Sequence, residues 1–157
     1  MSRLEVPLLH RTLWATGDIL LRAELNIVLK DSAASWHREL FRVDSGSEIT
    51  TMPAHRAKQL GIPLPRKAAK AVAHQPTGLT VRSGYLCFMI PGLGMEEYVV
   101  PCFFLGEPDT PSPKNPHASV PRNLLGLSGV IDKLRITFDG APALPRALYG
   151  NLMEQKI

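Results

Sequence analysis

The residues best suited to chemistry in this 157-residue chain lie in one short stretch, Asp44-Ser45-Gly46-Ser47. The stretch combines a carboxylate, two hydroxyls and a glycine, and apolar residues such as Val43 and Ile49 lie on either side of it. An acid at the end of an apolar strand is partly desolvated, which destabilises its ionised form unless nearby donors hydrogen-bond it. Carboxylates in such environments often act as general acids or bases. Asp44 is therefore the first candidate for a catalytic residue.

Other kinds of site are less well supported by the sequence. Ser45 or Ser47 as a nucleophile would need a G-x-S-x-G turn, which the chain lacks. Cys87 and Cys102 are far apart in the sequence, and the histidines show no metal-ligand spacing, so we expect no metal. The histidines in question are His10, His37, His55, His74 and His117.

Length and composition favour one soluble domain. The chain is long enough to bury a core, and its formal net charge is +4, with 18 Lys and Arg residues that are scattered rather than clustered. Scattered basic residues argue against a nucleic-acid partner. No signal peptide is recognisable, and no apolar run approaches the roughly 20 residues of a membrane-spanning helix, so we expect no membrane partner. The two cysteines lie in apolar runs, which favours reduced thiols and a cytoplasmic location.

A hairpin is predicted to deliver the chain to Asp44. Ile19 to Lys30 alternates apolar and polar residues, Asp31 to Ser35 supplies turn residues, and Trp36 to Val43 returns. The segment from Ile19 to Leu29 can also be drawn as a helix. After the candidate site, Pro53 and Ala54 to Leu60 predict a short helix that ends at Gly61.

The second half of the chain predicts further β-structure. His74-Gln75-Pro76-Thr77-Gly78 is typical of a loop tip between two extended arms. Tyr85 to Ile90 and Glu97 to Leu105 predict a second hairpin, and Gly106 to Pro121 predicts a surface loop. A buried apolar run, Asn123 to Leu127, follows. Next come a short helix from Ser128 through Leu134 and a strand from Arg135 to Phe138. The last 17 residues show only a weak amphipathic pattern, which assigns no element.

Three of these features occur in the order seen in retropepsin-like aspartic proteases, and the chain resembles a bacterial member of that family. They are the Asp-Ser-Gly sequence in its apolar frame, the hairpin-like segment His74 to Gly78, and Leu124-Leu125-Gly126 before a helix and strand. The resemblance covers roughly residues 20 to 139. It implies a mainly β protein with the acid-protease β-barrel, one or two short helices and one lobe per chain. Residues 1–18 would form an N-terminal arm, 19–140 the protease domain and 141–157 a C-terminal extension.

The resemblance also implies a function and a role for each motif residue. The protein would be an aspartic endopeptidase that acts on peptide or protein substrates without a cofactor. It would work as a homodimer in which each chain contributes Asp44. Gly46 would donate its N–H to the carboxylates, Ser45 would bond across the dimer, and Ser47 would bond the outer carboxylate oxygen. The flap would comprise His74, Gln75, Pro76, Thr77 and Gly78, and the motif after the flap would be Leu124, Leu125 and Gly126.

The sequence departs from the family pattern in three places. The expected flap lacks a glycine-rich tip, Ser45 replaces the commoner threonine, and both termini are long. A flap that cannot close would lose substrate positioning and water exclusion. The alternative function is therefore a catalytically silent, protease-like module for peptide binding or dimerisation, although intact Asp44, Ser45 and Gly46 favour the enzyme.

Overall fold

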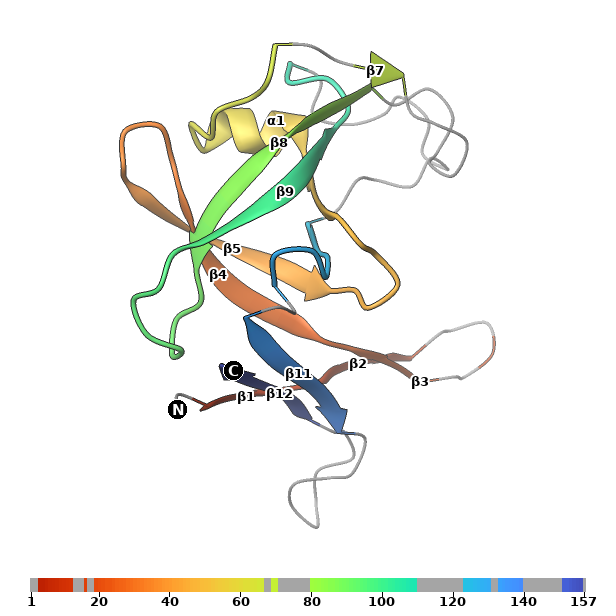
Figure 1. Ribbon diagram of the computed structural model, residues 1–157. Helices are drawn as coiled ribbons and strands as arrows, with labels where there is room; N and C mark the ends of the chain where they lie inside the picture. The colour runs from red at the N-terminus through yellow and green to blue at the C-terminus, as the bar shows by residue number, and fades with distance from the viewer. Residues whose placement is uncertain are drawn as a thin grey trace.

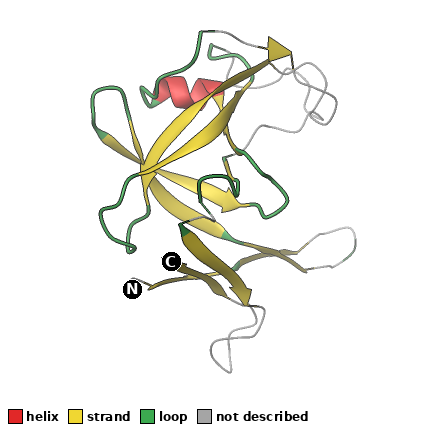
Figure 2. Cartoon of the chain, viewed as in Figure 1, coloured by secondary structure: helices red, strands yellow, loops and turns green. Residues whose placement is uncertain are grey.

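The computed structural model describes residues 3–12, 16, 19–66, 69–70, 80–109, 123–130, 133–139 and 151–156. Within these residues nearly all regular structure is β, which confirms the prediction of a mainly β protein (Figure 1, Figure 2). The strands are β1 (Arg3–Pro7), β2 (Leu9–Thr12), β3 (Ile19–Arg22), β4 (Glu24–Lys30), β5 (Trp36–Val43), β6 (Thr50–Pro53), β7 (Ala69–Lys70), β8 (Thr80–Met89), β9 (Tyr98–Leu105), β10 (Leu124–Leu125), β11 (Leu134–Asp139) and β12 (Asn151–Lys156). The helix described is α1 (Ala54–Gln59), and no helix in the described parts of the chain is long and apolar enough to cross a membrane.

The main sheet curls into a closed barrel. Its strand order is β4-β5-β10-β6-β9-β8-β7, and β4 also pairs with β8, which joins the two ends and leaves only β7 outside the ring. Side chains that alternate along the strands fill the interior, because successive residues of a strand point to opposite faces. The fully or nearly fully buried residues of β4, β5, β8 and β9 are Leu25, Ile27, Leu29, Phe41, Val43, Leu86, Phe88, Tyr98, Val100, Cys102 and Phe104.

The two predicted hairpins are confirmed. β4 and β5 pair antiparallel from Glu24↔Arg42 to Lys30↔Trp36, so the helical interpretation of residues 19–29 is wrong. The apolar residues of β4 recur at every second position and are buried on one face, a pattern that a helix would have spread around its axis. β8 and β9 form the second hairpin, in which the rings of Phe88 and Tyr98 stack at 5.4 Å.

The predicted short helix is also confirmed. It begins at Ala54 and buries Ala54 and Ala57 against the barrel. Pro53 occupies the N-cap position rather than the first helical position. Gly61 follows the helix with a φ of 71°, a conformation that glycine adopts without steric cost, and this ends the helix as expected.

The chain termini form a second sheet that the sequence pattern does not predict. β12 pairs antiparallel with β1 on one side and with β11 on the other, so the two ends of the chain lie side by side (Figure 1). β2 pairs with β3. The strand predicted from Arg135 to Phe138 is confirmed as part of β11.

Some expectations fall wholly or partly outside the described residues. These include most of the surface loop and the entire expected flap from His74 to Gly78, although β7 and β8 pair antiparallel on either side of that segment. The helix expected from Ser128 to Leu134 is not found in the described part of that segment. Ser128 to Val130 form a turn in which Gly129 has a φ of 76°, a value that an α-helix does not contain, and β11 already begins at Leu134.

Candidate functional site

The candidate aspartate lies in the connection between β5 and β6, residues 44–49, which we call the aspartate loop. Although β5 and β6 are consecutive in the sequence, they do not pair with each other, because β10 lies between them. β10 runs parallel to β5, with Leu125 opposite Val43, and antiparallel to β6, with Leu124 opposite Thr51. The structure therefore brings two sequence motifs together, Asp44-Ser45-Gly46-Ser47 and Leu124-Leu125-Gly126.

Backbone hydrogen bonds hold both ends of the aspartate loop against the chain at and after β10. The Asp44 N–H donates to the Leu125 carbonyl at 3.1 Å. Further along, the Leu127 N–H donates to the Ser47 carbonyl at 3.0 Å, and the Ser128 N–H donates to the Glu48 carbonyl at 2.8 Å. The loop position is thus fixed by main-chain groups rather than by the side chains that the loop carries.

The Asp44 carboxylate is half-buried and accepts a hydrogen bond within its own loop. The Gly46 N–H donates to Asp44 Oδ1 at 3.0 Å. A Cβ on Gly46 would lie 3.3 Å from that same oxygen, closer than an ordinary van der Waals contact. The backbone approach expected at Gly46 is therefore made, and a larger residue would crowd the carboxylate.

Gly126 is under a stronger constraint. A Cβ there would lie 2.4 Å from the Ile49 carbonyl carbon and 2.7 Å from the Thr50 nitrogen, both backbone atoms. The Gly126 N–H donates to Thr50 Oγ1 at 3.1 Å, and Thr50 is completely buried. Thr50 was not singled out from the sequence, although hydroxyl residues between the apolar Ile49 and Met52 are a signal that a buried polar group needs a partner.

The two serines of the loop differ in their surroundings. The Ser47 hydroxyl donates to the Ile49 carbonyl at 2.8 Å, so the bond expected from Ser47 to the Asp44 carboxylate is not formed. The reason is local, since the chain turns toward β6 after Ser47 and the Ile49 carbonyl is within reach of the half-buried hydroxyl. Ser45 is exposed, and the partner expected for it belongs to a second copy of the chain.

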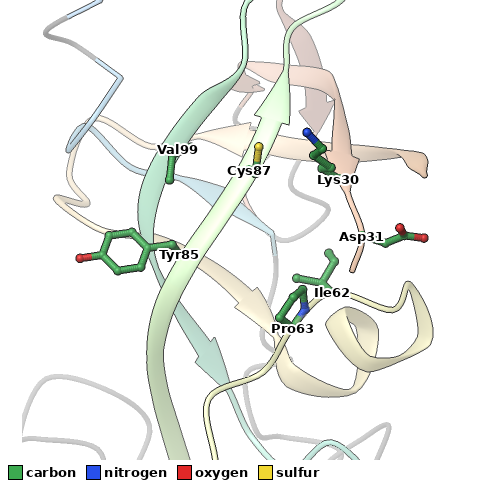
Figure 3. A pocket seen from close by; sticks show the side chains of 7 residues that line it. All are labelled: Lys30, Asp31, Ile62, Pro63, Tyr85, Cys87 and Val99. Atoms are coloured by element: carbon green, nitrogen blue, oxygen red, sulfur yellow. The ribbon is translucent and has the colours of Figure 1, made fainter. Parts of the chain in front are cut away.

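Two cavities that described residues line lie elsewhere on the barrel, and Asp44 lines neither. One, of about 170 Å³, lies beside the outer face of β8 and β9 (Figure 3). Its lining residues are Lys30, Asp31, Ile62, Pro63, Tyr85, Cys87 and Val99. The other, of about 520 Å³, lies between the chain after α1 and the residues around Arg82 and Asp109.

The cysteines are not poised for nucleophilic chemistry. Burial, together with the hydrogen bond that the Cys87 thiol donates to Glu97, raises the pKa of Cys87. Burial raises the pKa of Cys102 to about 12. Both groups are therefore protonated at neutral pH, whereas the thiolate is the reactive form. Neither cysteine is in a disulfide.

The chemistry available to the site is that of a single carboxylate. Among the described residues no three His, Cys, Asp or Glu side chains come together as a metal site would require. Two other described aspartates are engaged elsewhere, Asp31 with His37 and Asp109 with Lys58. One carboxylate can accept or donate one proton, so acid and base catalysis together would need a second group beside Asp44. No protein-family model matches this chain, and no curated protein or solved structure is significantly similar to it.

Proposed function

We propose that the chain is one subunit of a homodimeric, retropepsin-like aspartic endopeptidase, with Asp44 from each subunit forming the catalytic pair. The observation that carries the proposal is the insertion of β10 between β5 and β6, which clamps the loop that bears Asp44. A loop fixed at both ends holds its carboxylate in one geometry, as a catalytic group requires. The closed barrel beneath it supplies a rigid base.

The mechanism uses two carboxylates that share one proton, because two charges at hydrogen-bond distance cannot both form without a large cost. The ionised member takes a proton from a water molecule, which attacks the peptide carbonyl carbon, while the protonated member donates its proton to the carbonyl oxygen. Collapse of the tetrahedral intermediate expels the amine with a proton from the pair, while a hydroxyl of the intermediate returns a proton to the pair as the carboxyl product forms. The Gly46 N–H supports the ionised form of Asp44 through its bond to Oδ1.

The need for a second subunit follows from the content of the chain. The chain has one Asp-Ser-Gly sequence and is too short for two such lobes. The half-buried Asp44 and the exposed Ser45 leave a surface on which a second aspartate loop can sit. A symmetric dimer would bring identical loops together about its axis.

The test is hydrolysis of a mixed peptide library from acidic to neutral pH by wild type, Asp44→Asn and a matched control, Asp109→Asn. Asp44→Asn should abolish cleavage while sedimentation and thermal melting stay close to wild type, because the amide has the same shape but cannot act as the base. Asp109→Asn should keep activity, since Asp109 is exposed and paired with Lys58.

A second part of the same test uses dilution. Specific activity of the wild type should fall as the protein is diluted below the dimer dissociation constant. Wild-type rates in Asp44→Asn, or full activity in a strictly monomeric protein, would refute the protease. Peptide binding without any cleavage by wild type would instead favour the silent module.

A further inference from the structure

Arg42 lies on the same face of β5 as the candidate aspartate. Phe41 and Val43 are buried in the barrel, so Arg42 points to the opposite face, along with Leu40. The Asp44 N–H still pairs with β10, so the extended chain continues to Asp44. Residues two apart on a strand share a face and lie about 7 Å apart. A ligand that reaches the Asp44 carboxylate therefore passes close to the Arg42 side chain.

The guanidinium of Arg42 has an unused donor. Its Nε is buried and makes no hydrogen bond, and no ion pair that joins described residues includes Arg42. Arginine keeps its charge at any working pH, so the group cannot relieve this cost by losing a proton. A charged donor that is enclosed without an acceptor is destabilising. Because the chain itself encloses Nε, an incoming group meets the half-buried Arg42 side chain at its outer nitrogens, Nη1 and Nη2.

Main-chain pairing on both sides of β5 holds Arg42 in this position beside Asp44. The Arg42 N–H donates to the Asn123 carbonyl at 3.0 Å, and its neighbours across the sheet are Glu24 on β4 and Leu124 on β10. Glu24 lies directly opposite but does not form an ion pair with Arg42 within the described structure. An incoming carboxylate, which can bind a guanidinium with both oxygens, would pair with the outer nitrogens of Arg42, whose charge no described residue pairs.

We infer that Arg42 is a substrate-specificity residue that binds an aspartate or glutamate side chain of the peptide close to the bond that the Asp44 pair cleaves, an inference that rests on the proposed protease function. Phosphate-bearing or neutral side chains fit less well. A neutral side chain leaves the charge unpaired, and a phosphate adds charge that Glu24 and Asp44 on the same surface repel. The substrate class is therefore acidic peptides.

The experiment uses quenched peptides that are identical except for one residue, Glu or Gln, placed in turn at each position within four residues of a cleaved bond. At pH 6, where glutamate is ionised, the wild type should show a kcat/KM about tenfold or more higher for Glu than for Gln at one position at least. Arg42→Gln should bring this ratio to about one, and Arg42→Lys should keep part of it because the charge remains.

Arg38→Gln is the matched control. Arg38 is exposed and lies on the same strand and face as Arg42, but it is about 20 Å along the strand from Asp44. Its replacement by glutamine changes the net charge by the same amount as Arg42→Gln. The Glu-to-Gln ratio should be the same in Arg38→Gln as in wild type. A wild type that cleaves peptides without preferring Glu, or an Arg42→Gln variant that keeps the preference, overturns the inference while the protease stands.

A binding measurement separates this outcome from failure of the protease itself. Labelled Glu and Gln peptides are titrated into Asp44→Asn and into Asp44→Asn combined with Arg42→Gln, and anisotropy gives the dissociation constants. If no peptide is cleaved but Glu peptides bind about tenfold tighter only when Arg42 is present, the acidic-peptide site is upheld and the protease falls. Equal binding of Glu and Gln peptides to Asp44→Asn overturns the inference in either case.

Discussion

Replacement of Gly126 by alanine tests directly whether close packing of β10 against β6 holds the aspartate loop in place. The new Cβ would lie 2.4 Å from the Ile49 carbonyl carbon, 2.7 Å from the Ile49 oxygen and 2.7 Å from the Thr50 nitrogen. All three are backbone atoms, so no side-chain rotation can relieve the overlap. Thr50 cannot move away easily either, because it is completely buried and pairs with Cys102 on β9. The expected response is separation of β10 from β6.

The size of the effect follows from two losses. Overpacking at a site that cannot expand costs about 1–3 kcal/mol. Separation also breaks the bond from the Gly126 N–H to Thr50 Oγ1, and leaving a buried polar group unpaired costs about 1–3 kcal/mol more. The free energy of unfolding should therefore fall by about 2–6 kcal/mol, a large part of the 5–15 kcal/mol of a typical domain. In a chain of this length that corresponds to a melting temperature lower by about 4–24 °C.

Urea unfolding and thermal melting of purified Gly126→Ala against wild type measure this change, with Gly61→Ala as the control. Gly61 has a φ of 71°, but its nearest neighbour to an added Cβ is at 3.6 Å, so Gly61→Ala reports backbone strain of about 1–2 kcal/mol without a clash. Gly126→Ala should be clearly less stable than Gly61→Ala. A Gly126→Ala protein within about 1 kcal/mol of wild type would show that β10 does not clamp the loop as the structure indicates.

Two further changes probe the loop hydroxyl and the β4–β5 turn. Ser47→Ala should lower the free energy of unfolding by about 1 kcal/mol through loss of the bond to Ile49 and leave the pH dependence of kcat/KM unchanged. A shift of the acid limb would mean that the hydroxyl reaches Asp44 in the dimer. The bond with His37 and two backbone N–H groups lower the pKa of Asp31, so the stabilisation from Asp31 is present above its ordinary value near 4 and is lost as the pH falls through the lowered folded-state value. Between about pH 4 and pH 2 the urea midpoint of wild type should therefore fall more steeply than that of Asp31→Asn, and parallel slopes would contradict this.

The parts of the fold that were predictable from the sequence are those with local signals. The alternation in β4 and β5, the turn residues after Lys30 and the glycine after α1 each act within a few residues, and the structure has the corresponding elements. β12 had no such signal. Its partners are β1 and β11, and only pairing with both of them makes a strand of residues whose own pattern is weak.

The candidate site was predictable in its residues but not in all its contacts. The Asp44 motif and the Leu124-Leu125-Gly126 motif were singled out separately, and the structure brings them together. The direction of the Ser47 hydroxyl was predicted wrongly, because a hydroxyl takes the nearest good acceptor and the loop backbone decides which one that is. Thr50 and Arg42 were missed because their importance depends on burial and on partners across the sheet, which one strand's sequence does not reveal.

The residues around Asp44 are of two kinds, those whose backbone positions the aspartate loop and those whose side chains act on a substrate. The loop is positioned by the Leu125 carbonyl, by the N–H groups of Leu127 and Ser128, and by the absence of a Cβ at Gly126. A change at Gly126 should therefore lower stability and activity together, because both depend on the same backbone geometry. The side chains of Asp44 and Arg42 extend from this backbone but do not hold it in place. Asp44→Asn should therefore remove turnover, and Arg42→Gln should remove selectivity, in proteins that melt near the wild-type temperature. If either substitution instead unfolds the protein as Gly126→Ala does, the loop is held by its side chains, and the backbone account of the site is wrong.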